Sequence, residues 1–338
     1  MLVCIYSGSL NLVRKSGVGQ AALHQKAMLE KMGQEVTFKW NCGAELVHIN
    51  TVFPDSLAAA YAARAVGATV IWYGHSTMED FRDSFKGSNQ CAPTFRRWLR
   101  LCYGSGDAVI TPTRYSKALL DGYHINKPVY ALSNGVDTDF FAPSAERRAT
   151  FRNLHGLCDG DKAVMSAGHF VERKGILDFI ELAKMLPQTR FFWYGYTSPG
   201  IVPAKIRRAM AAAPKNVSFP GFVSSDELRD AYCGCDLFCF PSREETEGIV
   251  VLEALASGIP VLVRDIPVYS GWLQDGTNVY KARNNGDFLH RSQYILDRKL
   301  PDLTAAGCRT AQARNITETG RKLLRVYDSI MSDRAAKN

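Results

Sequence analysis

The sequence predicts an α/β fold of two domains, each built around a parallel β-sheet. Short apolar runs alternate along the chain with segments of helical periodicity, an order that favours parallel strands joined by helices. Several of these runs lead into polar or glycine-containing loops, which is where open α/β sheets bind their ligands. A length of 338 residues allows two domains of ordinary size.

The composition is that of a soluble globular protein, with 46% apolar and 22% charged residues. No apolar run approaches the roughly 18 residues of a membrane-spanning helix, and the N-terminus indicates a strand rather than a signal peptide. Nine cysteines, an odd number, favour reduced thiols in a cytoplasmic protein. The group Cys233, Cys235 and Cys239 lacks a common zinc spacing, so we expect no metal ion.

The net charge of +8 is concentrated in the first part of the chain. Residues 1–135 carry 14 Lys and Arg against 9 Asp and Glu, a net +5, and residues 136–338 carry 27 against 24, a net +3. This excess favours an anionic partner for the first domain, and we expect a membrane surface. A nucleic acid is the less favoured alternative, because no helix-turn-helix or aromatic strand motif is present.

Two features of the first domain point to a ligand site. A helix opens at a glycine-rich turn with Gly17 and Gly19, which lets a ligand approach the backbone or is an ordinary turn. His75 follows a strand and faces the ligand-binding edge, although a single histidine is more often structural. The expected strands are 3–6, 36–39, 46–49, 69–73, 107–111 and 128–132, and the expected helices include 55–66 and 115–122.

A helix expected from Pro93 is basic and amphipathic. A basic helix with a tryptophan is typical of an interfacial membrane segment, worth roughly 1 kcal/mol per cation near anionic lipid. An ordinary helix that packs its apolar face inward fits the pattern equally well. The apolar face holds Phe95, Trp98, Leu99 and Cys102. The basic residues of this region are Arg82, Lys86, Arg96, Arg97 and Arg100.

In the second domain the polar loop after an apolar strand at 237–240 carries the strongest motif. Glu245 and Glu253 have seven residues between them, so one precedes the following helix and the other lies inside it. The helix start offers free N–H groups and a positive dipole end to an anion. These N–H groups belong to the segment Gly248, Ile249 and Val250.

Another pair of charges precedes a second helix of this domain. Arg173 and Lys174 clamp a diphosphate if they face the same edge, or are solvated surface charges. The other strands are expected at 162–167, 191–194, 217–219 and 261–263. The other helices are expected at 176–185, 225–233, 287–296 and 318–330, and residues 146–152 are a charged stretch of the chain.

The spacing of Glu245, Gly248 and Glu253 resembles the motif of the retaining nucleotide-sugar glycosyltransferases of family four. The resemblance implies a GT-B fold, with two Rossmann-like domains facing across a cleft and a C-terminal helix crossing back to the first. It implies that Glu245 holds the donor sugar, Glu253 the ribose, and the N–H groups around Gly248 the diphosphate. It also implies a functional His75 near the sugar, so His75 and Glu245 are the expected catalytic residues.

The same resemblance implies further donor contacts. Gly17 and Gly19 would face the donor, and Phe222 and Val223 would border the nucleotide base. Arg173 and Lys174 would hold the phosphates. The chain departs from the family at His169, where an arginine is usual.

Residues 75–85, the basic helix, and residues 106–117 are similar to bacterial diacylglycerol glucosyltransferases. This resemblance implies transfer of glucose from UDP-glucose to the 3-hydroxyl of diacylglycerol, by a cytoplasmic enzyme peripheral to the inner face of the membrane. It implies no cofactor beyond the nucleotide sugar and no metal. The alternatives are another acceptor, such as phosphatidylinositol or a polysaccharide intermediate, and a GT-B sugar-nucleotide epimerase.

The domain boundary is expected at the Asn-Gly turn of residues 134–137. The first domain would comprise residues 1–137, face the acceptor and the membrane, and include a C-terminal helix at about 318–338. Residues 138–317 would form the domain that binds the nucleotide sugar.

Overall fold

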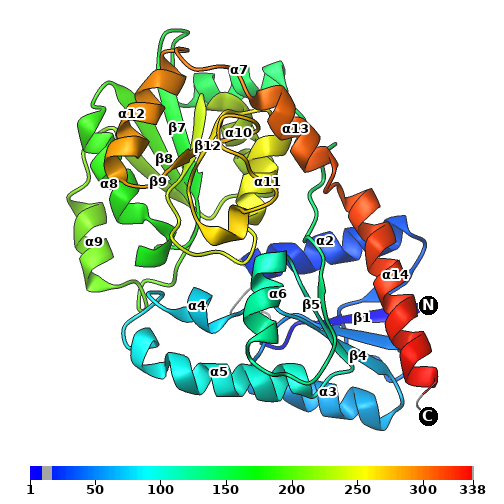
Figure 1. The fold of residues 1–338 in the computed structure, drawn as a ribbon. Coiled ribbons are helices and arrows are strands. Elements are labelled where there is room, and N and C mark those ends of the chain that lie inside the picture. Colours follow the sequence, from blue (N-terminus) through cyan, green and yellow to red (C-terminus); the bar gives the residue numbers. More distant parts are fainter. Residues whose placement is uncertain (10–16, 337–338) are drawn as a thin grey trace. The chain divides into compact units, whose positions relative to one another are not determined.

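The computed structural model describes residues 1–9 and 17–336, and the chain divides into two compact units (Figure 1). Unit 1 comprises Met1–Arg82, Gly87–Gly135 and Arg314–Asn338, and unit 2 comprises Asp83–Lys86 and Val136–Ala313. The boundary between the units follows Gly135, whereas the expected boundary followed residue 137. The C-terminal helix belongs to unit 1.

Unit 1 is built on a parallel sheet. Over the described residues it has six strands in the order β2-β1-β3-β4-β5-β6, and every neighbouring pair is parallel. The strands are β1 (Leu2–Tyr6), β2 (Glu35–Thr37), β3 (Leu46–Ile49), β4 (Thr69–Tyr73), β5 (Ala108–Thr111) and β6 (Val129–Ala131). The helices are α2 (Gly17–Lys31), α3 (Pro54–Ala65), α4 (Met78–Phe81), α5 (Ser88–Gly104), α6 (Arg114–Asp121) and α14 (Ile316–Ala335).

Both faces of this sheet are covered by helices, because side chains alternate along each strand. Val70 and Trp72 of β4 pack in one apolar cluster with α3 and α5. Ile71 and Tyr73 pack in the other with α2 and α14, to which α14 contributes Leu323, Tyr327 and Ile330. The last helix of the chain is therefore part of the core of unit 1.

Unit 2 repeats this architecture. Over the described residues its sheet has the order β12-β11-β10-β7-β8-β9, again with parallel neighbours. The strands are β7 (Lys162–Ala167), β8 (Thr189–Tyr194), β9 (Val217–Gly221), β10 (Leu237–Phe240), β11 (Val261–Arg264) and β12 (Tyr280–Ala282). The α-helices are α7 (Ala145–Leu154), α8 (Ile176–Met185), α9 (Ala204–Ala211), α10 (Ser225–Gly234), α11 (Ile249–Ala256), α12 (Asn285–Leu296) and α13 (Thr304–Gln312), and two short 3₁₀ helices are η1 (Glu172–Lys174) and η2 (Pro267–Tyr269).

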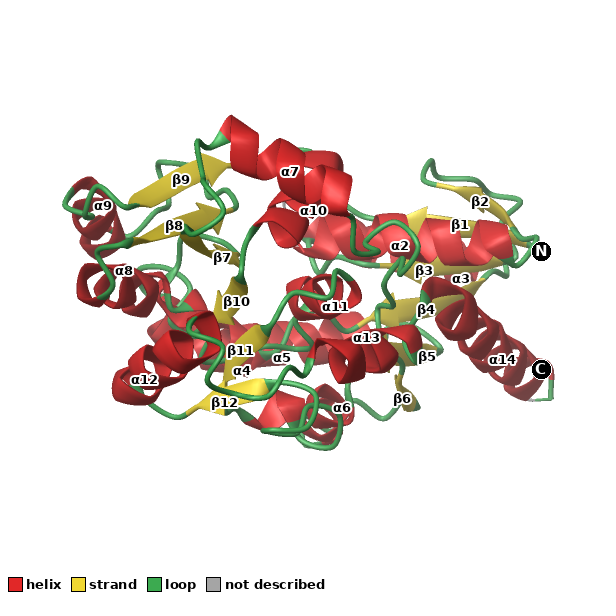
Figure 2. Cartoon of the chain, turned by 90° about the horizontal axis from the view of Figure 1, so that it is seen from above, coloured by secondary structure: helices red, strands yellow, loops and turns green. Residues whose placement is uncertain are grey.

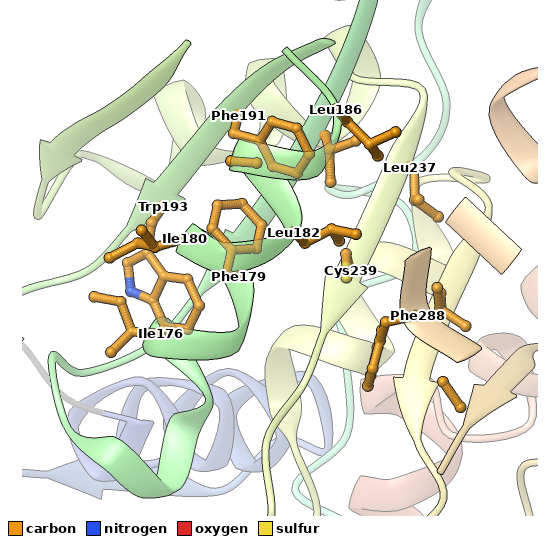
Figure 3. Packing of buried hydrophobic residues seen from close by; sticks show 14 of the residues in the cluster. Ile176, Phe179, Ile180, Leu182, Leu186, Phe191, Trp193, Leu237, Cys239 and Phe288 are labelled. Carbon is orange, nitrogen blue, oxygen red and sulfur yellow. The ribbon is translucent and has the colours of Figure 1, made fainter. Parts of the chain in front are cut away.

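The core of unit 2 is aromatic. Figure 3 shows Phe179 of α8 between Phe191 and Trp193 of β8, and the ring centroids of both pairs lie 5.2 Å apart. Helices α8, α9 and α12 cover this face of the sheet, whereas α10, α11 and α13 lie on the other (Figure 2). The predicted α/β class with parallel sheets is therefore confirmed.

One local expectation was wrong, and several elements were not predicted. Helix α5 begins at Ser88 rather than at Pro93, which lies inside the helix and costs it one backbone hydrogen bond. Residues 146–152, for which no helix was predicted, are part of α7, whose Arg147 pairs with Asp230 of α10 at 2.6 Å. Helices α9 and α13 and strand β12 were not predicted, because they are short or only weakly periodic. None of the described helices combines the length and the hydropathy that crossing a bilayer requires.

Candidate functional site

The loop between β10 and α11 is organised by a glycine at the helix start. Gly248 is the N-cap of α11 and has a φ of 89°, which strongly favours glycine. No side chain caps α11, so its first N–H groups stay available to a ligand. Both Ile249 and Val250, the first residues of the helix, are only half-buried.

Glu245 lies in this loop and is held by two nearby groups. Its Oε1 atom accepts a hydrogen bond from Lys174 Nζ at 2.5 Å and another from Ser242 Oγ at 2.6 Å. Arg173 Nη1 lies 4.0 Å away. Burial alone would raise the pKa of Glu245, but the charges of Lys174 and Arg173 outweigh it and lower the pKa below its ordinary value. Glu245 is therefore a buried carboxylate at neutral pH.

The turn between β7 and α8 brings the two cations to Glu245. They belong to η1, and the next residue, Gly175, has a φ of 78°. A Cβ atom at Gly175 would lie 2.4 Å from the carbonyl oxygen of Pro241, so only glycine lets this turn approach the β10 loop so closely. Arg173 donates from Nη1 to the carbonyl of Glu244 at 2.7 Å, which ties the same two segments together.

Glu253 lies in the second turn of α11, and its side chain is buried. Its Oε2 atom accepts a hydrogen bond from the Tyr232 hydroxyl at 2.9 Å. Burial raises the pKa of Glu253 to about 7, although the bond from Tyr232 acts in the opposite direction. Glu253 therefore changes its protonation state near neutral pH.

Around β9 the expected base-binding residues are accessible. Phe222 is 42% exposed, and Val223 is half-buried. His169, which stands where the family usually has arginine, contacts the carbonyl oxygen of Tyr196 through Nδ1 at 2.6 Å. Arg173, by contrast, lies beside Glu245.

In unit 1, His75 is separated from the end of β4 by Gly74 alone and is 9% exposed. Its Nε2 atom lies 2.9 Å from Asn50 Oδ1, and its ring stacks on Tyr73 with a centroid distance of 4.2 Å. Burial lowers the pKa of His75 to about 3, and the nearby His48 acts in the same direction to a smaller extent. The imidazole is therefore neutral at physiological pH.

The two glycines expected to face the donor begin α2. Gly17 is exposed, and a Cβ atom there would meet nothing within 4 Å. Gly19 is buried. Ser16, the residue before them in the predicted turn, lies outside the described residues.

The basic segment divides into packed and exposed residues. Phe95 and Trp98 pack against a cluster that contains Leu99 and Cys102, as an ordinary inward-facing helix requires, and the Trp98 indole donates to the carbonyl of Val52 at 2.6 Å. Arg96 is half-buried over the ring of Tyr123. The exposed cations are Arg82, Lys86, Arg97 and Arg100.

Unit 2 thus brings together Arg173, Lys174, Glu245 and the start of α11. Sequence reasoning missed Ser242, Tyr232 and Tyr269, the last with a buried hydroxyl beside Gly248. Only Ser242 carried a signal, since it follows an apolar strand. In the described ranges, 1–9 and 17–336, no three His, Cys, Asp or Glu side chains lie close enough to hold a metal ion. The two cations and the uncapped helix start suit a phosphate-bearing ligand, and Glu245 suits its hydroxyl groups.

Two family models match this chain. Residues 147–316 match the model described as "Glycosyl transferases group 1", and residues 17–140 match "Glycosyltransferase Family 4". The processive diacylglycerol alpha-glucosyltransferase of Acholeplasma laidlawii is 40% identical over 332 residues, which cover 98% of this chain and 99% of the relative.

Solved structures resemble the whole chain in fold. A sucrose-phosphate synthase from Thermosynechococcus elongatus superposes with a TM-score of 0.84 at 16% identity, over 98% of this chain and 100% of that one. Anabaena HepE, in complex with UDP-glucose, superposes with a TM-score of 0.76 at 16% identity, over 97% and 100%. At these identities the likeness concerns the fold alone, and it confirms the expected GT-B class.

Proposed function

This chain belongs to the glycosyl transferases of group 1 and is a glycosyltransferase, and we propose that it transfers glucose from UDP-glucose to the 3-hydroxyl of diacylglycerol, with retention of the anomeric configuration. The reaction takes place at an anionic membrane surface, with the protein on the cytoplasmic face. The observation that carries the proposal is the buried contact between Lys174 Nζ and Glu245 Oε1 beside the uncapped start of α11.

The donor site follows from the charges in unit 2. Lys174, Arg173 and the N–H groups of Ile249 and Val250 offer positive charge and donors to the diphosphate. Glu245 accepts hydrogen bonds from the sugar hydroxyls, and Glu253 accepts those of the ribose. UDP-glucose is the proposed donor because the relative from A. laidlawii is named as a glucosyltransferase and a protein of the same fold binds UDP-glucose.

The acceptor is proposed from the same relative, whose name specifies diacylglycerol. A lipid acceptor requires contact with a membrane surface, and the exposed cations Arg82, Lys86, Arg97 and Arg100 suit anionic headgroups. The side chains of Trp98 and Arg96 contribute less than their sequence positions suggest, because both pack inward.

In the proposed step, the bond between the anomeric carbon and the phosphate oxygen breaks while the acceptor oxygen bonds to that carbon on the same face. The proton of the acceptor hydroxyl passes to the departing phosphate oxygen. Lys174, Arg173 and the start of α11 stabilise the charge that gathers on the leaving group, so no metal ion is required. His75, being neutral, contacts a sugar hydroxyl rather than supplying a proton.

The test is an assay of the full chain with UDP-glucose and mixed micelles of diacylglycerol and anionic lipid, read by mass spectrometry of the lipid fraction. We expect a glucolipid, α-linked by NMR, that forms equally well with EDTA and is absent with Glu245→Ala. Glu181→Ala, an exposed glutamate of unit 2 that pairs only with Lys184 among the residues described, is the matched control and should be fully active.

Other outcomes would redirect the assignment. UDP release without glucolipid would exclude diacylglycerol and favour another acceptor, such as phosphatidylinositol. Interconversion of the sugar nucleotide without an acceptor would favour an epimerase. A covalent glycosyl-enzyme would exclude the same-face mechanism.

A further inference from the structure

A buried pair of amide side chains, Asn50 and Gln25, lies beside His75. Asn50 follows β3 directly and is 3% exposed, and Gln25 lies in α2 and is fully buried. Gln25 Nε2 donates to Asn50 Oδ1, and Asn50 Nδ2 donates to Gln25 Oε1, each at 2.9 Å. The two side chains form a closed, reciprocal pair, which fixes the orientation of each amide relative to the other.

Asn50 Oδ1 has a second partner, His75 Nε2, at 2.9 Å. With the Asn50 amide in this orientation, its carbonyl oxygen accepts hydrogen bonds and donates none, so His75 Nε2 is the donor and carries the proton. The other ring nitrogen, Nδ1, then holds a lone pair. Nδ1 has no hydrogen-bond partner in residues 1–9 and 17–336, and it is not among the fully enclosed polar atoms of those residues.

We propose that Asn50 and Gln25 are positioning residues that hold His75 as the Nε2–H tautomer, so that Nδ1 is presented to a ligand hydroxyl as a hydrogen-bond acceptor. The proposal rests on the proposed function for the identity of that ligand, a sugar with free hydroxyl groups. The tautomer itself is a property of unit 1 and is measurable without turnover.

The surroundings of His75 support a neutral ring. Tyr73 stacks on one face, and behind it His48 stacks on Tyr73 with a centroid distance of 5.5 Å. His48 is also neutral, because burial lowers its pKa to about 3. Over the described residues, Tyr73 and His48 are the titratable groups that face His75, and no carboxylate is placed to favour its cation.

The first experiment is NMR of the full chain labelled with ¹⁵N-histidine. We expect the His75 ring of the wild type to show the Nε2–H tautomer and to stay neutral from pH 5 to 8. Asn50→Leu should abolish the preference for this tautomer. Tyr73→Phe is the matched control, since it removes a hydroxyl that bonds the carbonyl of Leu132 and leaves the amide pair intact. An Nδ1–H tautomer in the wild type, or an unchanged tautomer in Asn50→Leu, would overturn the proposal.

Asn50→Asp separates positioning from a merely structural role. The new carboxylate still accepts the Nε2 proton but favours the imidazolium, so we expect the pKa of His75 to rise by about 2 units or more. Relative to the wild type at the same pH, transfer by this variant should then fall about twofold between pH 8 and pH 5, since about half of its His75 rings are then cations without an acceptor nitrogen. An equal loss of activity at every pH would indicate damage to packing and count against the proposal.

Two replacements of His75 test independently which ring nitrogen contacts the ligand. Asparagine places a polar atom near the position of Nδ1, whereas glutamine reaches the position of Nε2. We expect His75→Asn to retain about tenfold more transfer activity than His75→Gln. The reverse order would overturn the assignment of Nδ1. NMR can show the Nε2–H tautomer while both variants remain fully active. In that case Asn50 and Gln25 do set the tautomer, but His75 has no role in transfer.

Discussion

Lys174 Nζ lies 2.5 Å from Glu245 Oε1, and both side chains are largely withdrawn from solvent. The lysine comes from the turn after β7 and the glutamate from the loop after β10, 71 residues apart in the chain. Two groups that suit different parts of a sugar nucleotide are thus paired with each other. Their contact joins the turn after β7 to the loop after β10.

Lys174→Met should destabilise the protein, because it leaves Glu245 as a buried carboxylate without its nearest cation. Removing one partner of a buried pair costs about 3–5 kcal/mol. The double variant Lys174→Met/Glu245→Gln removes both charges and should recover most of that loss, while transfer stays absent. Thermal unfolding of the full chain measures the stability of the single and the double variant. Equal destabilisation by the single and double variants would contradict the interaction.

Gly175→Ala should disrupt the site without changing any charged group. The new Cβ atom would meet the carbonyl oxygen of Pro241 at 2.4 Å, and the φ of 78° is itself unfavourable for alanine by about 1–2 kcal/mol. We expect a lower melting temperature and at least a tenfold loss of donor affinity, measured by titration with UDP.

Gly160→Ala is the control for this substitution. A Cβ atom there meets nothing within 4 Å, and the backbone is not in the left-handed region. Its affinity for UDP should equal that of the wild type. A Gly175→Ala variant with full affinity would show that the close approach of the two segments is not needed for binding.

Glu253 should make UDP binding depend on pH. Its pKa is raised to about 7 in the folded protein, so the acceptor carboxylate is lost below that value. We expect the dissociation constant of UDP to rise about tenfold from pH 8 to pH 6, a difference of about 1.4 kcal/mol. Glu253→Gln should bind UDP more weakly than the wild type, with a dissociation constant that does not change with pH. Isothermal titration of both proteins with UDP at several pH values measures this difference.

The same group affects stability with a defined sign. In the unfolded chain a glutamate ionises near pH 4.3, whereas folded Glu253 keeps its proton until about pH 7. Between these values the folded state binds more protons, so its stability falls as pH rises. Relative to Glu253→Gln, the wild type should therefore lose stability from pH 4.5 to 7 in the absence of UDP. If the stability of the two proteins changed with pH in the same way, the pKa of Glu253 would not be raised in the folded state.

Arg97 and Arg100 should contribute to membrane binding, since both are exposed on α5. Each cation near an anionic surface is worth about 1 kcal/mol, so Arg97→Ser/Arg100→Ser should weaken binding to anionic vesicles by about 25-fold. Flotation with vesicles of phosphatidylglycerol and phosphatidylcholine measures this. Lys322→Ser/Arg325→Ser on α14 removes the same charge from another exposed surface of unit 1, and equal effects of the two pairs would indicate net charge rather than a specific surface.

Much of the site could be predicted because its residues follow apolar strands. The segments that lead to His75, Lys174 and Glu245 each begin at a buried parallel strand, and such strands are the clearest short-range pattern in the sequence. Helix α7 was missed for the converse reason. It contains few apolar residues, and its contacts with α10, such as the ion pair of Arg147 with Asp230, join residues far apart in the chain.

The parallel α/β class and the motif of Glu245, Gly248 and Glu253 could be predicted from the sequence, because they depend on periodicity and spacing, which are properties of neighbouring residues. The return of the last helix to the first unit was implied by the family resemblance and not by any local pattern. The folded structure was needed to show that Lys174 contacts Glu245, that Trp98 packs inward, and that Asn50 and Gln25 form a hydrogen-bonded pair beside His75. Such contacts join residues far apart in the chain, and their energies depend on burial and orientation that only the folded chain establishes.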